Sequence, residues 1–104
     1  MSKDELLFAI KDIIVDHQGK DNQISADEIG PMVGIYEDAT HVQTRASILK
    51  TIEKFKLPVA ASSRGYYLIK DEKELEEYMS RIDNRIFEME NRKTLVEAAF
   101  RDYY

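Results

Sequence analysis

The last third of the chain contains neither glycine nor proline, and this absence constrains the fold more than any other feature. Residues 72–101 are therefore predicted to form one long helix. Apolar residues recur along it with a seven-residue period, as they do in a helix that meets a second helix along one seam. One column of this seam contains Leu75, Ile82, Met89, Val96 and Tyr103, and the other contains Met79, Ile86, Lys93 and Phe100.

Two kinds of partner could cover this seam. The helix could pack, along all or part of its length, on the first helix of its own chain, where Phe8 and Val15 offer apolar surface. However, 30 helical residues span about 45 Å, which is more than the preceding part of the chain can cover. We therefore expect a homodimer in which Lys93, the one charged residue of the seam, helps to fix the register. The expected dimerisation residues are Leu75, Met79, Ile82, Ile86, Met89, Val96 and Phe100.

Size and composition narrow the class of protein. The chain has 104 residues and no cysteine, so it allows one small domain with an appendage and excludes disulfide bonds and thiol nucleophiles. No apolar run approaches the roughly 20 residues that a transmembrane helix needs. The alternating charged and apolar residues from Lys3 onward do not look like a secretory signal. We expect a cytoplasmic protein that does not contact membranes.

The sequence contains no arrangement that is typical of an active site. Ser62 and Ser63 have no nearby general base, the two histidines lack metal-ligand spacing, and the glycines form no phosphate-binding loop. We therefore expect a binding module rather than an enzyme, with no catalytic residue, no cofactor and no metal.

Two helices are predicted in the N-terminal part. Residues 3–18 have helical apolar spacing, and Gly19 ends this helix. Ser25 and Glu28 have the spacing of a capping box, which starts a second helix. Pro31 is expected to bend or end that helix early, because proline has no N–H to donate to the carbonyl four residues back.

A third helix is predicted after a turn at residues 34–38. Asp38 or Thr40 can cap this helix. It must stop by Leu57, because Pro58 disfavours a helical conformation in the residue before it. The apolar stripe expected to face the core consists of Val42, Ala46, Leu49, Ile52 and Phe55.

A β-hairpin is predicted after the third helix. Residues 58–61 and 66–69 favour strands, and the segment Ser-Ser-Arg-Gly between them favours a turn. Strand alternation directs one of the neighbouring residues Tyr66 and Tyr67 to the core and the other to the surface.

The charges of the chain are segregated. The formal net charge is −5, but residues 40–70 contain six basic residues against one acidic residue, a net charge of +5. The flanking segments, 1–39 and 71–104, are both acidic. A basic stretch in an acidic protein is either a solvated face or a contact surface for a polyanion, since local charge governs such a contact.

The order of the predicted elements is that of a winged helix-turn-helix. Ile24 supplies a short strand between the first two helices, and the hairpin follows the third helix. We predict an α+β fold, mainly α with a small β-hairpin, in which residues 1–70 form the winged helix-turn-helix domain and residues 71–104 form a coiled-coil-like helix.

This order suggests a mode of binding to double-stranded DNA. The third helix is expected to enter the major groove, while the hairpin reaches the backbone or the minor groove. The candidate DNA-binding residues are Thr40, His41, Gln43, Thr44, Arg45, Ser47, Lys50, Ser63 and Arg64.

Three segments carry a resemblance to a known group of proteins: ISADEI at residues 24–29, TRA at 44–46 and LPVAASSRGYYLI at 57–69. With the acidic C-terminal helix, they resemble small winged-helix proteins encoded by bacteriophages and prophages. The resemblance covers roughly residues 24–100 and implies a DNA-binding role in phage regulation or replication, in the cytoplasm of the host cell. The chain departs from this pattern at Gly30 and Pro31, where most such motifs have good helix formers.

A protein partner is the alternative to DNA. The acidic ends of the chain and its net charge of −5 would suit an inhibitor that occupies the basic nucleic-acid groove of a host or defence protein. The sequence thus leaves two hypotheses, a dimeric DNA-binding protein and an acidic protein-binding winged helix.

Overall fold

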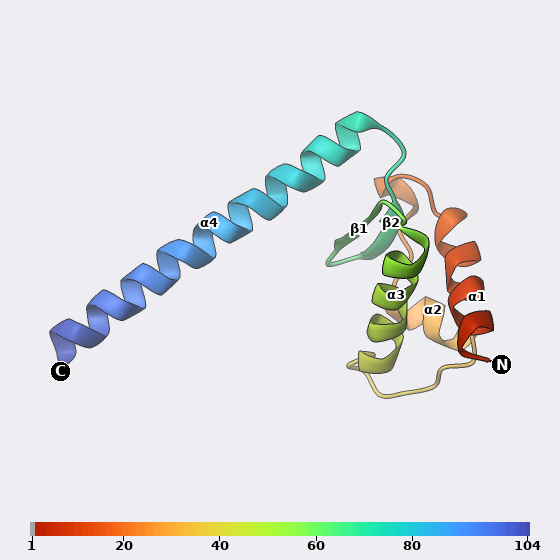
Figure 1. Ribbon diagram of the computed structural model, residues 1–104, viewed down its shortest axis with the longest axis horizontal. Coiled ribbons are helices and arrows are strands. Elements are labelled where there is room, and N and C mark those ends of the chain that lie inside the picture. The colour runs from red at the N-terminus through yellow and green to blue at the C-terminus, as the bar shows by residue number, and fades with distance from the viewer. Residues whose placement is uncertain (1) are drawn as a thin grey trace. The chain divides into compact units, whose positions relative to one another are not determined.

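The computed structural model describes residues 2–104 and is mainly helical, with one small antiparallel sheet (Figure 1). The chain divides into two compact units, of which the N-terminal unit ends at Asp71 and the C-terminal unit is Glu72–Tyr104. The N-terminal unit contains α1 (Lys3–Val15), a 3-10 turn η1 (Lys20–Asn22), α2 (Ala26–Met32), α3 (Val42–Phe55), β1 (Val59–Ser62) and β2 (Gly65–Leu68). The C-terminal unit is a single helix, α4 (Glu72–Tyr103). Within residues 2–104, no helix combines the length and the apolar character needed to cross a membrane.

Helix α1 is shorter than the sequence predicts. It starts at its cap, Ser2, whose hydroxyl accepts the N–H of Glu5 at 3.2 Å. It ends at Val15 instead of continuing to residue 18, because the next segment is paired with β2. The carbonyl of His17 accepts the N–H of Leu68 at 2.8 Å, and the Leu68 carbonyl accepts the N–H of Gly19, also at 2.8 Å.

Helix α2 begins at Ala26 and ends after seven residues, as predicted. The hydroxyl of Ser25 accepts the N–H of Glu28 at 3.3 Å, and it donates to the Glu28 carboxylate at 3.1 Å. Pro31 lies in the last turn, and the chain leaves the helix at Gly34, where φ is +80°. Local sequence signals therefore determine where this helix begins and ends.

The hairpin joins β1 and β2 in a register that pairs Val59 with Leu68 and Ser62 with Gly65, so Ser63 and Arg64 form the two-residue turn. The other edge of β2 pairs with Ile24. The N–H of Ile24 donates to the Tyr66 carbonyl at 2.9 Å, and the N–H of Tyr66 donates back at 2.8 Å. These bonds place β2 in the middle of a small three-segment sheet.

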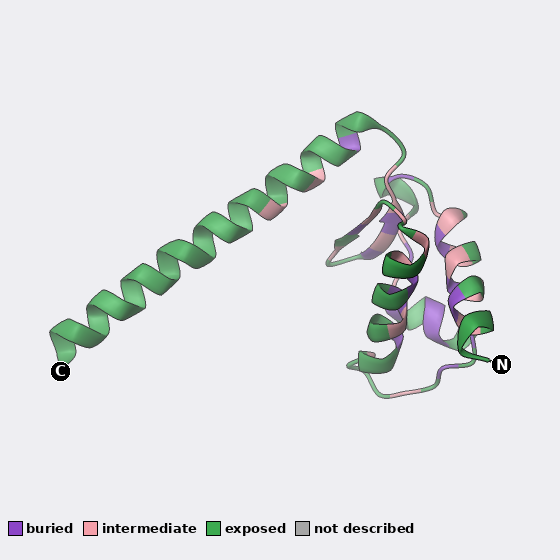
Figure 2. Ribbon diagram, in the orientation of Figure 1, coloured by how far each residue is buried: buried purple, intermediate pink, exposed green. Residues whose placement is uncertain are grey.

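The core of the N-terminal unit lies between α1, α2, α3 and this sheet (Figure 2). Tyr67 is buried and Tyr66 is half-buried, as strand alternation predicts. Phe8 of α1 packs edge-to-face against Phe55 of α3, with 5.0 Å between the ring centroids. The buried cluster consists of Ile10, Ile14, Ile24, Ala26, Ile29, Val33, Ile35 and Ile48.

The face of α3 that meets the core differs from the predicted one. Thr44, Ile48 and Thr51 are fully buried, whereas Val42 is 67% exposed and Leu49 is 56% exposed. Ala46 is also exposed. The prediction that Val42, Ala46 and Leu49 face the core is therefore wrong.

Two contacts let threonines take these core positions. The Thr51 hydroxyl donates to the Ser47 carbonyl at 2.8 Å, so its polar atom is satisfied within the helix. Thr44 packs on Gly30 of α2, where a Cβ atom would stand 3.0 Å from the Thr44 Oγ1. The missing side chain at Gly30 thus makes room for Thr44.

Helix α4 is continuous, as the absence of glycine and proline predicts. It is coloured as exposed along most of its length in Figure 2. The residues of the predicted seam include Leu75 at 39% exposure and Met89 at 66%.

Candidate nucleic-acid interface

The outer face of α3 combines polar, basic and small apolar side chains. Its exposed residues include Gln43, Arg45 and Lys50, interspersed with the apolar row Val42, Ala46 and Leu49. We call this surface, made of these six residues, the α3 face. It offers donors for base edges and phosphates together with methyl groups for apolar contact.

The N-terminus of α3 is held by Glu37. Its two carboxylate oxygens accept the N–H groups of Gln43 and Thr44, each at 3.0 Å. The backbone N–H of Thr44 is the main cause that lowers the pKa of Glu37, against a smaller raising effect of burial. The helix is thus capped by a residue from the preceding loop, and the prediction that Asp38 or Thr40 caps it is wrong.

Thr40, which is exposed, and His41 make side-chain contacts to other residues of the N-terminal unit. Both the hydroxyl and the N–H of Thr40 donate to the Asp38 carboxylate, at 2.5 and 3.0 Å, and the hydroxyl is the main cause that lowers the pKa of Asp38. His41 adopts a left-handed conformation with φ of +52° and places its Nε2 2.9 Å from the Asp27 Oδ1. These contacts fix the turn before α3 and link α3 to α2.

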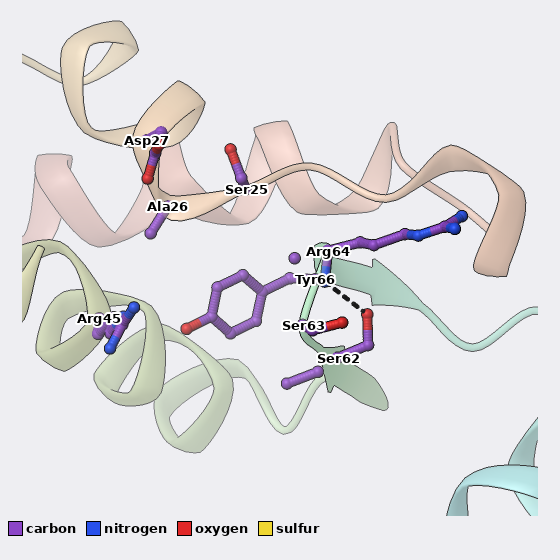
Figure 3. Close-up of a pocket in the computed structure, with 10 residues that line it drawn as sticks. Ser25, Ala26, Asp27, Arg45, Ser62, Ser63, Arg64 and Tyr66 are labelled. Atoms are coloured by element: carbon purple, nitrogen blue, oxygen red, sulfur yellow. Dashed lines mark hydrogen bonds between the residues drawn. The ribbon is translucent and has the colours of Figure 1, made fainter. Parts of the chain in front are cut away.

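A cleft of about 290 Å³ lies between the start of α2, the first half of α3 and the hairpin (Figure 3). Arg45 comes to it from α3, and Arg64 comes from the hairpin turn. The lining also includes Ser25, Asp27, Ser63 and Tyr66. Two arginines that are 19 positions apart in the sequence therefore lie on one surface.

Tyr66 lies between these arginines. Figure 3 shows its hydroxyl directed toward Arg45, while the side chain of Arg64 extends away from the ring. Burial raises the pKa of Tyr66, and the positive charge of Arg45 opposes this rise. The phenol therefore remains neutral at physiological pH and can donate a hydrogen bond into the cleft.

A side-chain hydrogen bond connects the hairpin to the segment before α2. The Ser62 hydroxyl donates to the Gln23 side-chain carbonyl, and it accepts the N–H of Arg64 at 3.1 Å. The turn that carries Arg64 is therefore tied to the segment before α2, which positions the arginine relative to α3.

The structure divides the nine candidate DNA-binding residues into two groups. Five are exposed on the α3 face or the hairpin turn: Gln43, Arg45, Lys50, Ser63 and Arg64. The other four are used within the fold. Thr44 is fully buried, Ser47 is half-buried, and Thr40 and His41 make the turn contacts described above. The expectation that Thr44 lies on the outer face of the helix is wrong, because it shares the buried stripe of Ile48 and Thr51.

Three further residues of this region were not singled out from the sequence. Tyr66 and Asp27 line the cleft, and Glu37 caps α3. Strand alternation already places one tyrosine of the Tyr66–Tyr67 pair at the surface, so that residue could have been found. No local sequence pattern signals Glu37, because its carboxylate accepts N–H groups that lie six and seven residues further along the chain.

Comparison with family models, with curated proteins and with solved structures finds no match. The residues described in the structure also contain no group of three or more histidine and acidic side chains that could hold a metal ion. Function is therefore inferred from the geometry of the N-terminal unit and the charge pattern of the chain.

Proposed function

We propose that the N-terminal unit is a winged helix-turn-helix that binds double-stranded DNA. In this proposal α3 is the recognition helix, α2 supports it, and the β1–β2 hairpin is the wing. The observation that carries it is that Arg45 from α3 and Arg64 from the hairpin turn line the same cleft. A role in phage regulation or replication, as the resemblance implies, belongs to the same proposal.

The side chains of the α3 face suit the major groove. Gln43 can pair with adenine, and Arg45 or Lys50 with guanine or a phosphate. Ala46, which is exposed and does not pack in the core, can contact the methyl group of thymine. The apolar row on this helix is therefore compatible with base readout.

The wing complements this helix. Arg64 lies in a two-residue turn next to the exposed Ser63, and these residue types contact phosphates or enter the minor groove. With α3 in the major groove, the wing would reach the adjacent backbone. The acidic remainder of the chain would then keep the duplex on this one surface.

Binding of a duplex at several salt concentrations tests the proposal. We expect the affinity to fall steeply with salt, because each phosphate contact releases a counterion and contributes about −0.9 to the slope of log K against log salt. The double variant Arg45→Ala/Arg64→Ala should reduce the magnitude of that slope by about 2 for each copy of the chain that binds. Fluorescence anisotropy with a labelled duplex measures both quantities.

The matched control removes the same charge elsewhere. Lys3 is exposed on α1, and Lys54 pairs with Asp4 of α1 at 2.8 Å. The variant Lys3→Ala/Lys54→Ala should keep most of the salt slope, since neither residue lines the cleft. Equal losses in the two variants, or unchanged binding after loss of both arginines, would show that the assigned surface is wrong.

One observation favours a second candidate, an acidic protein that binds another protein. Val42 and Leu49 are more than half exposed on α3, and such an apolar row is also typical of a protein interface. The partner would present a basic groove to the acidic segments 1–39 and 71–104, which flank α3 in the sequence. The variant Val42→Gln/Leu49→Gln separates the candidates: it should abolish capture of a stoichiometric partner from nuclease-treated lysate if the partner is a protein.

A further inference from the structure

The seam of α4 is exposed along the whole helix. Helix α4 runs over 32 residues, which is a length of about 48 Å. In heptad notation the a positions are Met79, Ile86, Lys93 and Phe100, and the d positions are Leu75, Ile82, Met89, Val96 and Tyr103. All of these side chains are exposed except Ile82, which is intermediate. An apolar row of this length is costly to leave in water.

The charges beside the seam are sorted by sign. Every e position from the second turn of α4 onward is acidic, and these residues are Glu76, Asp83, Glu90 and Glu97. The charged g positions, Arg85 and Arg92, are basic. One flank of the seam is therefore negative throughout, and the other is positive in its central two heptads.

We propose that α4 forms a parallel, in-register two-stranded coiled coil with a second copy of this chain. In a parallel coiled coil, each g position lies beside the e position of the next heptad in the other helix. Arg85 then meets Glu90 of the second copy, and Arg92 meets Glu97 of the second copy. Two-fold symmetry doubles each pair, so the dimer gains four interhelical ion pairs.

The opposite orientation is disfavoured by the same charges. In an antiparallel pair, e positions face e positions and g positions face g positions. Acidic residues such as Glu90 and Glu97 would then line one side of the interface together. On the other side, Arg85 and Arg92 would face arginines of the second copy. Like charges in such contact destabilise the pair. The charge pattern thus selects one orientation rather than merely allowing association.

Two details of the helix are consistent with this arrangement. Within the helix, Arg101 donates to the Glu97 Oε1 at 3.1 Å, which leaves the second carboxylate oxygen to accept from Arg92 of the second copy. Lys93 occupies an a position, where a single polar residue fixes register and limits the assembly to two strands. A shift by one heptad would place Lys93 against Ile86 or Phe100 instead of against its own copy.

Single cysteines report the orientation directly, because the chain has none of its own. The variants Leu75→Cys and Val96→Cys of the full chain should each form a covalent dimer in a glutathione redox buffer, since a d residue lies beside its own copy only in a parallel, in-register pair. Asn84→Cys, at the outward f position, is the control and should stay mostly uncrosslinked. Non-reducing gel electrophoresis measures the fraction of covalent dimer formed by each of the three variants.

The outcomes of this experiment separate the alternatives. A dimeric mass by sedimentation equilibrium with cross-linking at both seam positions supports the proposal. A dimeric mass without a cross-link at either seam position would show that the d residues do not lie beside their own copies, as in an antiparallel pair, and would overturn it. A monomeric mass at about 100 μM chain would also overturn it, without bearing on DNA binding by the N-terminal unit.

A charge reversal tests the ion pairs themselves. The variant Arg85→Glu/Arg92→Glu should weaken the dimer by at least about tenfold at low salt, and mixing it with Glu90→Arg/Glu97→Arg should restore a heterodimer. The control Lys73→Glu/Arg81→Glu makes the same charge change at the outward b and c positions and should cost the dimer much less. Equal weakening by both reversals would contradict the assigned pairs.

Discussion

At the scale of single residues, the contact between Ile24 and β2 depends on a missing side chain. Gly65 has φ of +139°, and a Cβ atom there would overlap the carbonyl group of Ile24 and stand 2.9 Å from the Ser25 nitrogen. The backbone bonds between Ile24 and Tyr66 need this close approach. Gly65 is therefore the residue that lets the hairpin join the segment before α2.

This close approach predicts a large cost for Gly65→Ala. Backbone strain and overlap each cost about 1–3 kcal/mol, so we expect the variant to lose about 2–6 kcal/mol in the free energy of unfolding. Gly34→Ala is the control, because Gly34 also has a positive φ, of +80°, but nothing lies within 4 Å of its Cβ position. It should lose only about 1–2 kcal/mol. Equal losses in urea unfolding would show that the contact with Ile24 is unimportant.

The carboxylate of Glu37 makes the stability of α3 depend on pH. Its pKa is lowered in the folded protein, chiefly by the N–H of Thr44. A lowered folded pKa means that the contribution is complete above the ordinary pKa of a glutamate and is lost as the pH falls through the folded pKa. Stability should therefore decline on the acidic side of the ordinary value.

Glu37→Gln should remove this part of the pH dependence. We expect the variant to be less stable than the natural chain at about pH 7, and the difference to narrow in acid, as the pH falls through the lowered pKa of Glu37 and the natural carboxyl group becomes protonated. Urea unfolding followed by circular dichroism measures both values. Glu53→Gln, an exposed charge change on the same helix, is the control, and a similar narrowing there would contradict the role of Glu37.

At the scale of elements, the sequence predicts where helices and strands lie better than it predicts which side of α3 is buried. Glycine, proline and capping residues mark the ends of α2 and the position of the hairpin, and the absence of glycine and proline marks α4; these signals are local. The buried side of α3 is not a local property. It contains Thr44 and Thr51, which count as polar in any hydropathy pattern, and it depends on the space that Gly30 provides.

The same reason limits prediction of the candidate interface. Although the buried side of α3 differs from the predicted one, Arg45 and Lys50 are exposed as expected, whereas Thr44 is buried. Basic side chains are rarely buried, so their exposure could be predicted from residue type alone. The placement of Arg45 and Arg64 along the same cleft could not, because it requires the pairing of Ile24 with β2 and the hydrogen bond from Ser62 to Gln23.

At the scale of the whole molecule, a parallel coiled coil would attach two N-terminal units to the same end of one dimer. Binding of the first unit to a duplex then makes binding of the second an intramolecular step with a high effective concentration. The number of phosphates contacted by the complex would be doubled. The salt dependence of DNA binding should therefore report the oligomeric state.

We predict that Ile82→Asp/Ile86→Asp is monomeric and has about half the salt slope of the natural chain, because each phosphate contact adds a fixed increment to that slope. Phe87→Asp/Leu95→Asp is the matched control, since Phe87 and Leu95 are exposed apolar residues of α4 outside the a and d positions. It should stay dimeric and keep the full slope. Sedimentation equilibrium gives the mass, and anisotropy titrations of one duplex at several salt concentrations give the slope. A monomeric seam variant with an undiminished slope would mean that the two units bind DNA independently, so that the long helix serves a purpose other than bringing two DNA-binding surfaces to one site.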